Sequence, residues 1–325
     1  MDKETFWKNF NLGTELQISG SFIYNGLHQF DQLKSFYHEE EIFEFLYSLS
    51  VGIERLMKIN IILQEHTTET NQNEFEQTLI THNHQELLKR INQHHKLNLG
   101  KIHNEFLQLL SRFYKSMRYD RFNLSSVNDL SPERKSFIEF LEKHLNIKIS
   151  IEPLGVTPND KKIKKFLGKL VGKITSQLYD VLLENAYKLN IHTYEVRTFS
   201  KAYKIFLCKE FTFKKENILR RELLLHIINP QIDSNIKYYL EEIKPLNFEN
   251  YHFNFYLSCI LDTLELSQLS DELEILYEEI SNKKDRIETI EILASDFNFE
   301  YMEDDDDEWE YSAFTKEDFL DEEDD

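Results

Sequence analysis

Apolar side chains recur with a helical period along most of this chain. In the stretch 42–64 the 3.6-residue period is followed by Phe45, Leu46, Leu49, Ile53, Leu56, Met57 and Leu63. Glu54 and Lys58 lie four residues apart in this stretch, which is the spacing of an ion pair on the polar face of a helix. The pattern predicts a long amphipathic helix over 42–64.

Similar patterns predict further helices in the first half, over 81–91, 101–119 and 132–145. Thr81 is a good N-cap for the first of these, and Gly100 marks the break before the second. Ser131 caps the third, with Pro132 in its first turn. Residues 1–38 mix aromatic and turn residues and are expected to be an entry segment, and 66–77 a polar connection.

The stretch 149–160 is the expected domain boundary, because it contains Pro153, Gly155 and Pro158. Beyond it a helix is predicted over 161–189. The stretch 190–209 is open between a short extended piece and a continuing helix. Further helices are predicted over 217–229, 231–244, 250–266 and 268–295. The expected division is an N-terminal bundle at 1–150, a second helical domain at 151–302 and a tail at 303–325.

These patterns predict an all-α fold, and composition supports it. The chain of 325 residues has 8 Gly and 5 Pro, too few for a turn-rich β-sandwich or a phosphate-binding glycine loop. Cys208 and Cys259 lie in apolar runs, which argues against disulfides or a zinc site. His82 and His84 are two residues apart, which does not bring two imidazoles together on a helix. No metal or cofactor is therefore predicted.

The start of the chain has no secretory signal, and no apolar run reaches membrane-spanning length. We therefore expect a cytoplasmic protein that does not enter a membrane.

Charge is segregated along the chain, whose formal net charge is −20. Residues 303–325 hold 14 acids and one lysine, whereas 161–221 holds 15 Lys or Arg against 5 Asp or Glu. A basic segment of this kind attracts phosphate, and an acidic tail competes for it. The alternative is a solubilising tail together with solvated helix faces.

Polar groups are crowded where the 101–119 helix ends, in Arg118, Asp120 and Arg121. In one interpretation the two guanidiniums hold a phosphate while Asp120 orients one of them. In the other, Asp120 forms salt bridges with both and fixes the loop that follows. A buried network of this sort is costly unless it is well paired, which is a reason to consider a functional purpose.

Residues 40–145 resemble the HEPN superfamily of helical bundles. The resemblance rests on Gly52-Ile53-Glu54-Arg55-Leu56-Met57-Lys58, on Thr81-His82-Asn83-His84-Gln85-Glu86-Leu87-Leu88, and on a third helix that ends in Arg118-Tyr119-Asp120-Arg121. It implies an antiparallel bundle that pairs as a homodimer. In active members an Arg…His motif from each protomer cuts RNA without metal, and many members are toxins or antiviral defence proteins. Others are inactive and bind partners.

Arg118 matches the family's arginine by position. The family's histidine would fall at Asn123, Leu124 or Ser125, none of which is a histidine. His84 is the expected substitute for proton transfer. Arg90 with His95 has the motif's spacing, although a match of this kind arises easily by chance.

Two further groups are candidate nucleic-acid ligands. One is Arg197 and Lys201, between two apolar helices, where an interdomain hydrogen-bond network is the alternative. The other is the cluster of lysines Lys161, Lys162, Lys164 and Lys165, for which a solvated helix start is the alternative.

The acidic tail contains the aromatic residues Trp309, Tyr311, Phe314 and Phe319. Acidic peptides with aromatic anchors dock into basic grooves. We therefore predict that this tail folds back on the basic segment 161–221 or binds a partner that carries such a surface.

The expected function is an RNA-directed protein of bacterial defence or toxin type, with metal-independent endoribonuclease activity if it is active. The alternative is a catalytically inactive interaction protein whose acidic tail binds a basic partner or mimics nucleic acid. The clustered arginines favour the first, and the missing histidine favours the second.

Overall fold

The computed structural model describes residues 2–120, 122–124, 131–152, 155–191, 196–198, 200–214, 216–217, 219–220, 243–247, 253–261 and 270–291. The chain divides into two compact units, Met1–Leu219 and Arg220–Asp325. This division differs from the boundary expected near residue 150, since 151–219 shares a unit with the first helices.

The first unit is built from helices. They are α1 Lys3–Phe6, η1 Trp7–Asn11, α2 Leu12–Gln32, α3 Glu39–Glu65, α4 Gln72–Leu79, α5 His84–His94, α6 Lys101–Arg112, η2 Phe113–Met117, α7 Arg118–Asp120, α8 Pro132–Leu145, α9 Lys161–Lys188 and α10 Lys201–Phe206, where η marks a π-helical turn. The second unit contains α13 Phe253–Leu261, α14 Ser270–Glu278 and α15 Lys283–Glu291.

The predicted all-α class is confirmed, because the described residues contain no strand. Their one isolated bridge joins Ser35 to Pro158. None of the helices in the described part combines the length and the apolar character needed to cross a membrane.

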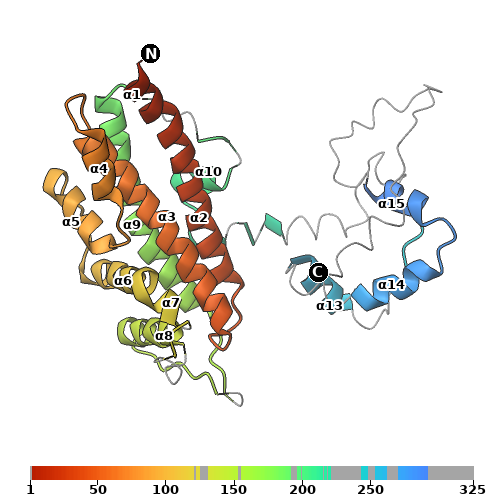
Figure 1. Ribbon diagram of the computed structural model, residues 1–325. Helices are drawn as coiled ribbons and strands as arrows, with labels where there is room; N and C mark the ends of the chain where they lie inside the picture. Colours follow the sequence, from red (N-terminus) through yellow and green to blue (C-terminus); the bar gives the residue numbers. More distant parts are fainter. Residues whose placement is uncertain are drawn as a thin grey trace, which may run out of the picture. The chain divides into compact units, whose positions relative to one another are not determined.

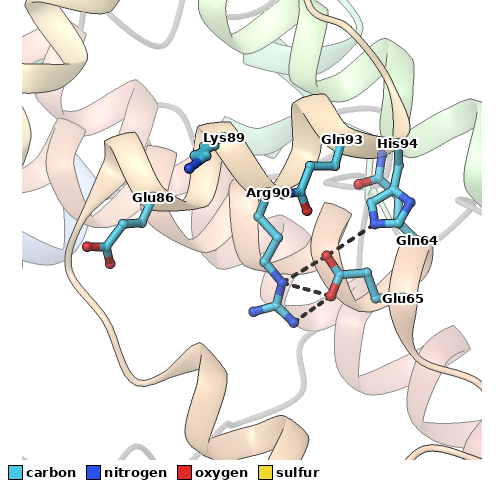
Figure 2. Close-up of a pocket in the computed structure, with 7 residues that line it drawn as sticks. All are labelled: Gln64, Glu65, Glu86, Lys89, Arg90, Gln93 and His94. Carbon is cyan, nitrogen blue, oxygen red and sulfur yellow. Dashed lines mark hydrogen bonds and ion pairs between the residues drawn. The ribbon is translucent and has the colours of Figure 1, made fainter.

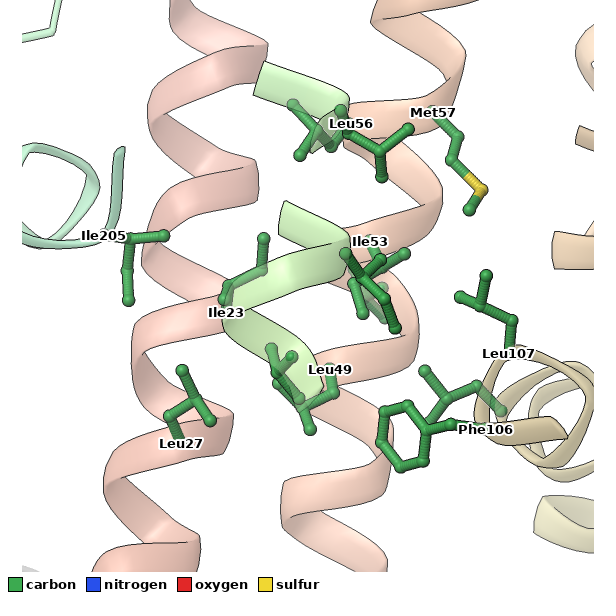
Figure 3. Packing of buried hydrophobic residues seen from close by; sticks show 14 of the residues in the cluster. Ile23, Leu27, Leu49, Ile53, Leu56, Met57, Phe106, Leu107 and Ile205 are labelled. Carbon is green, nitrogen blue, oxygen red and sulfur yellow. The ribbon is translucent and has the colours of Figure 1, made fainter. Parts of the chain in front are cut away.

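Helix α3 is the axis of the first unit, with α2, α5 and α9 packed around it (Figure 1). Its buried residues lie on every side of the helix, which is the pattern of a helix enclosed by others. Figure 3 shows Ile23 and Leu27 of α2 beside Leu49 and Ile53 of α3, with Phe106 of α6 on the other side.

The entry segment 1–38 consists largely of helices, which extend over residues 3–32. The glycines taken for turn residues permit close helix contacts instead. A Cβ atom on Gly20 would lie 2.6 Å from the Cα of Ala202 in α10, and one on Gly26 would lie 2.8 Å from Cγ of Leu49 in α3. Glycine here reflects the close approach of neighbouring elements rather than a break in the chain.

Two other boundaries differ from the sequence expectation. The connection expected over 66–77 includes the start of α4, where Asn71 Oδ1 accepts from the amide of Glu74. Helix α5 begins at His84 with Asn83 as its N-cap, whereas Thr81 hydrogen-bonds to Glu86.

The stretch 190–209, for which the sequence allows an extended piece or a helix, is helical in part. Asn190 has φ 57°, which ends the path of α9, and α10 then forms between Lys201 and Phe206. The expected helix 268–295 is two helices, α14 and α15, within its described part. Those expected over 217–229 and 231–244 fall mostly outside the described residues, as does the tail 303–325.

We predict that Gly20→Ala lowers the free energy of unfolding by about 1–3 kcal/mol, because the new methyl group would overlap α10. Alanine in an unconstrained helix would instead stabilise it by about 0.5–1 kcal/mol. Urea unfolding followed by circular dichroism measures the change.

The matched control is Gly100→Ala, where the nearest atom to the new Cβ would be His103 Nδ1 at 3.8 Å. Since Gly100 is the N-cap of α6, we expect a loss of only a few tenths of a kcal/mol or little more. Equal effects at the two glycines would contradict the packing described for Gly20.

Candidate functional site

A buried carboxylate on the central helix organises the candidate site. Glu54 of α3 is almost fully enclosed. Its Oε1 atom is 2.6 Å from Nζ of Lys58, and its Oε2 atom is 3.0 Å from Nδ1 of His82. A buried charge is costly unless paired, so these two partners are what makes the position tolerable. The predicted Glu54–Lys58 pair is present, but it lies in the interior rather than on a solvated face.

His82 lies just before α5 and is held on two sides. Its Nδ1 faces Glu54, and its ring meets the ring of Tyr114 edge-on, with centroids 4.7 Å apart. Its side chain remains 46% exposed. Nε2 of His82 makes no hydrogen bond to any residue that the structure describes. An imidazole oriented through one nitrogen by a carboxylate, with the other nitrogen open, is arranged for proton transfer.

Arg118 contacts the same tyrosine. The Cζ atom of its guanidinium is 3.9 Å from the ring centroid of Tyr114 and 4.5 Å from that of Tyr119. Its Nε is buried and has no hydrogen-bond partner. Within the described part of the chain no ion pair joins Arg118 to Asp120, and the expected pairing of Asp120 with Arg121 falls outside it. Arg121 lies outside the described residues.

Tyr114 joins the two sides of this cluster. Burial raises the pKa of its hydroxyl, the negative charge of Glu54 adds to the rise, and the charge of Arg118 opposes it. The net direction is upward, so the hydroxyl stays protonated at neutral pH. Tyr114 therefore offers a neutral donor between a histidine and an arginine.

Glu54, His82, Tyr114 and Arg118, here called the Arg118 cluster, combine three functions that acid–base chemistry on a phosphate requires. They provide a group that can transfer protons, a carboxylate that orients it, and a permanent cation that forms no ion pair among the described residues. Arginine presents its donors in the planar fork that phosphate oxygens accept.

His84 does not have the role expected for it. Its side chain is fully buried, Nε2 is 2.9 Å from the carbonyl oxygen of Ser50, and Nδ1 is buried without a partner. Burial lowers its pKa, and the hydrogen bond to Ser50 opposes this only in part. His84 is thus a neutral core histidine, and the open histidine is His82, two residues earlier.

A second polar cluster surrounds an open hollow of about 570 Å³ between α3 and α5 (Figure 2). Glu65 accepts Nε of Arg90 at 2.7 Å and its terminal nitrogen at 2.6 Å, while His94 lies 3.4 Å away. Arg90 also donates to the hydroxyl of Thr78 at 2.9 Å. The donors of Arg90 are thus largely used internally, in contrast to those of Arg118.

The alternative motif of Arg90 with His95 is not assembled, because His95 pairs with Glu184 at 3.5 Å instead.

The lysines of α9 separate into two groups. Nζ of Lys164 is bound by the carbonyl oxygen of Asp31 and lies 4.0 Å from its carboxylate, so this candidate nucleic-acid ligand anchors α9 to the end of α2. Lys161 is exposed at the start of the helix. Four other exposed lysines share one helix face, here called the α9 lysine stripe: Lys162, Lys165, Lys169 and Lys173.

Arg197 and Lys201 are both exposed, and they do not share a site with the Arg118 cluster. Nζ of Lys201 donates to Asn25 Oδ1 at 2.8 Å and lies above the ring of Tyr24. Ser200 between them caps α10. Lys201 is thus part of a contact between α10 and α2, as in the hydrogen-bond alternative.

No group of three His, Cys, Asp or Glu side chains suited to a metal ion occurs among the described residues. The tail aromatics Trp309, Tyr311, Phe314 and Phe319 lie outside them.

Comparisons of this chain with known proteins found no matching family model, no matching curated protein and no matching solved structure.

Sequence reasoning identified Arg118 but missed the residues around it. In the sequence His82 is weighed only as a metal ligand, and Glu54 is placed on the polar face of its helix. The available signal was the position of Glu54 within a helix whose apolar residues lie on all sides, because an acid in that setting needs partners from elsewhere.

We predict that His84 makes stability depend on pH. The unfolded chain takes up a proton near the ordinary histidine pKa of 6.5, whereas the folded chain resists it because that pKa is lowered. The stabilising contribution is therefore present above pH 6.5 and is lost as the pH falls below it. Between about pH 7 and pH 5 the free energy of unfolding of His84→Gln should fall less steeply than that of the wild type.

NMR of the imidazole nitrogens tests the same point in the unaltered protein. The ring of His84 should remain neutral at about pH 6, with its proton on Nε2. Protonation of this ring in the folded protein near pH 6.5 would contradict the assignment.

Proposed function

We propose that this protein is an RNA-directed HEPN-like protein that cuts RNA without a metal ion, of the kind found in bacterial defence and toxin systems. The observation that supports it is the Arg118 cluster. In it His82 is oriented by Glu54 and contacts Tyr114, which also contacts a guanidinium that has no carboxylate partner among the described residues.

In the proposed reaction, Nε2 of His82 takes the proton of a ribose 2′-hydroxyl. The 2′-oxygen attacks the adjacent phosphorus, and the bond from phosphorus to the 5′-oxygen breaks. The products are a 2′,3′-cyclic phosphate and a 5′-hydroxyl. Water supplies the proton of that hydroxyl, and the protonated His82 returns its proton to the hydroxide that remains. Arg118 stabilises the negative charge that builds up on the phosphate oxygens. Glu54 holds His82 in one orientation and stabilises its protonated ring.

The α9 lysine stripe supports an RNA-directed function independently of the cluster. Successive lysines of the stripe are three or four residues apart, so they repeat about every 6 Å along the helix. A row of exposed ammonium groups at this spacing suits the backbone of a nucleic acid strand.

A catalytically silent interaction protein is the second candidate. The separation of charge favours it, since 14 acids in residues 303–325 and the basic stretch 161–221 lie on one chain. In that case the tail would engage a basic partner, and the Arg118 cluster would hold an anionic group without cleaving it.

We predict that the purified protein cleaves RNA in EDTA, and that Arg118→Ala slows cleavage by about 10²–10³-fold because it removes the oxyanion donors. His82→Ala should slow it by about 10²-fold or more. Single-turnover cleavage of labelled RNA measures both effects, with circular dichroism to check folding.

Arg90→Ala is the matched control, since it removes an equally charged side chain from the hollow of Figure 2. Its cleavage rate should stay within about twofold of the wild type if the variant remains folded. A loss at Arg90 with none at Arg118 would move the site to the hollow. No cleavage by the wild type would reject the enzyme proposal.

For the α9 lysine stripe, we predict that changing its four lysines to glutamine weakens the salt dependence of single-stranded RNA binding. The slope of log affinity against log salt concentration should become less negative by about 3. The control changes Lys96, Lys135, Lys188 and Lys209, which are also exposed but scattered. Both variants lose the same charge, so equal slopes would mean that net charge rather than the stripe sets the affinity.

A further inference from the structure

Two aromatic rings next to Arg118 are open to solvent. Tyr119 is 50% exposed and Phe122 is 86% exposed. Exposed rings grouped beside a cation that forms no ion pair among the described residues indicate a surface that something else contacts.

The backbone fixes these rings relative to Arg118. The amide of Phe122 donates to the carbonyl oxygen of Tyr119 at 3.0 Å, which closes a turn where the helix ends. Tyr119 follows Arg118 directly and stacks on its guanidinium. The turn therefore brings one partly exposed and one almost fully exposed ring to the same helix end as the proposed phosphate ligand.

We propose that Tyr119 and Phe122 form a stacking platform for unpaired bases of the RNA strand, while Arg118 holds a phosphate of the same strand. This inference rests on the proposed function and specifies its substrate as single-stranded RNA. The flat face of an aromatic ring stacks on any base, whereas bases inside a duplex already stack on one another and cannot reach it.

Charge favours this occupant over a second copy of the chain. A second copy that packed on these rings would cover them but would supply no anion for Arg118. A nucleic acid strand supplies both partners that this surface lacks, namely a flat base for each ring and a phosphate for the cation.

The test separates base stacking from backbone binding. The probe is a single-stranded 2′-O-methyl oligoadenylate, which lacks the nucleophile and cannot be cut, together with the same strand carrying abasic sites. Affinities are measured by fluorescence anisotropy for the full chain, for Phe122→Leu, for Phe122→Tyr and for Tyr187→Leu. Tyr187 on α9 is 88% exposed and serves as an exposed aromatic away from the cluster.

We expect Phe122→Leu to weaken binding of the base-containing strand by roughly tenfold. Phe122→Tyr keeps an aromatic ring and should bind this strand as tightly as the wild type. Tyr187→Leu should leave the affinity unchanged. With the abasic strand the penalty at Phe122 should disappear, because the ring has nothing to stack on. A duplex of the same sequence should bind without any dependence on Phe122.

Three results would overturn the platform: an equal loss at Phe122 for normal and abasic strands, no loss for either, or a shift in oligomeric state with Phe122→Leu in place of a loss of binding. No binding of any strand by the wild type would overturn it too. The uncleavable probe keeps the outcomes separate, since stacking without cleavage would reject the catalytic proposal and leave the platform standing.

Discussion

The arrangement of the first unit depends on one buried charge. Helix α3 is enclosed on all sides by apolar neighbours, yet it carries Glu54 in its interior. A carboxylate in that place must be matched by cationic or hydrogen-bonding groups, or it destabilises the fold by several kcal/mol or becomes protonated. Lys58 supplies one partner from the same helix. His82 supplies the other from the segment before α5, so the requirement of one side chain fixes the position of that segment.

The position of His82 in turn determines what surrounds Arg118. The imidazole and the guanidinium both pack against Tyr114, so a titratable ring and a permanent cation share a single aromatic side chain. The same bundle contains a contrasting case at Arg90, whose donors are held by Glu65 and Thr78. Arginines of equal charge thus differ in availability because one lies next to a carboxylate and the other lies between tyrosines.

Part of the fold and part of the candidate site could be predicted from the sequence. Long helices with clear periodicity, such as α3 and α9, follow from local pattern alone. The helix over residues 12–32 did not, because Gly20 and Gly26 serve packing against partners far away in the chain. The candidate site likewise contains one residue that the sequence reveals and three that it does not. Arg118 was recognisable at the end of its helix, whereas Glu54, His82 and Tyr114 come from three segments that only the tertiary structure brings together.

The most direct test of this account is the rate of RNA cleavage in EDTA by Glu54→Gln, compared with Glu65→Gln. Glutamine keeps the shape of the side chain but removes the charge that orients and stabilises the His82 ring. The account predicts that Glu54→Gln, while still folded, cleaves at least tenfold more slowly than the wild type, and that Glu65→Gln does not. An unchanged rate for Glu54→Gln, or a loss confined to Glu65→Gln, would contradict it.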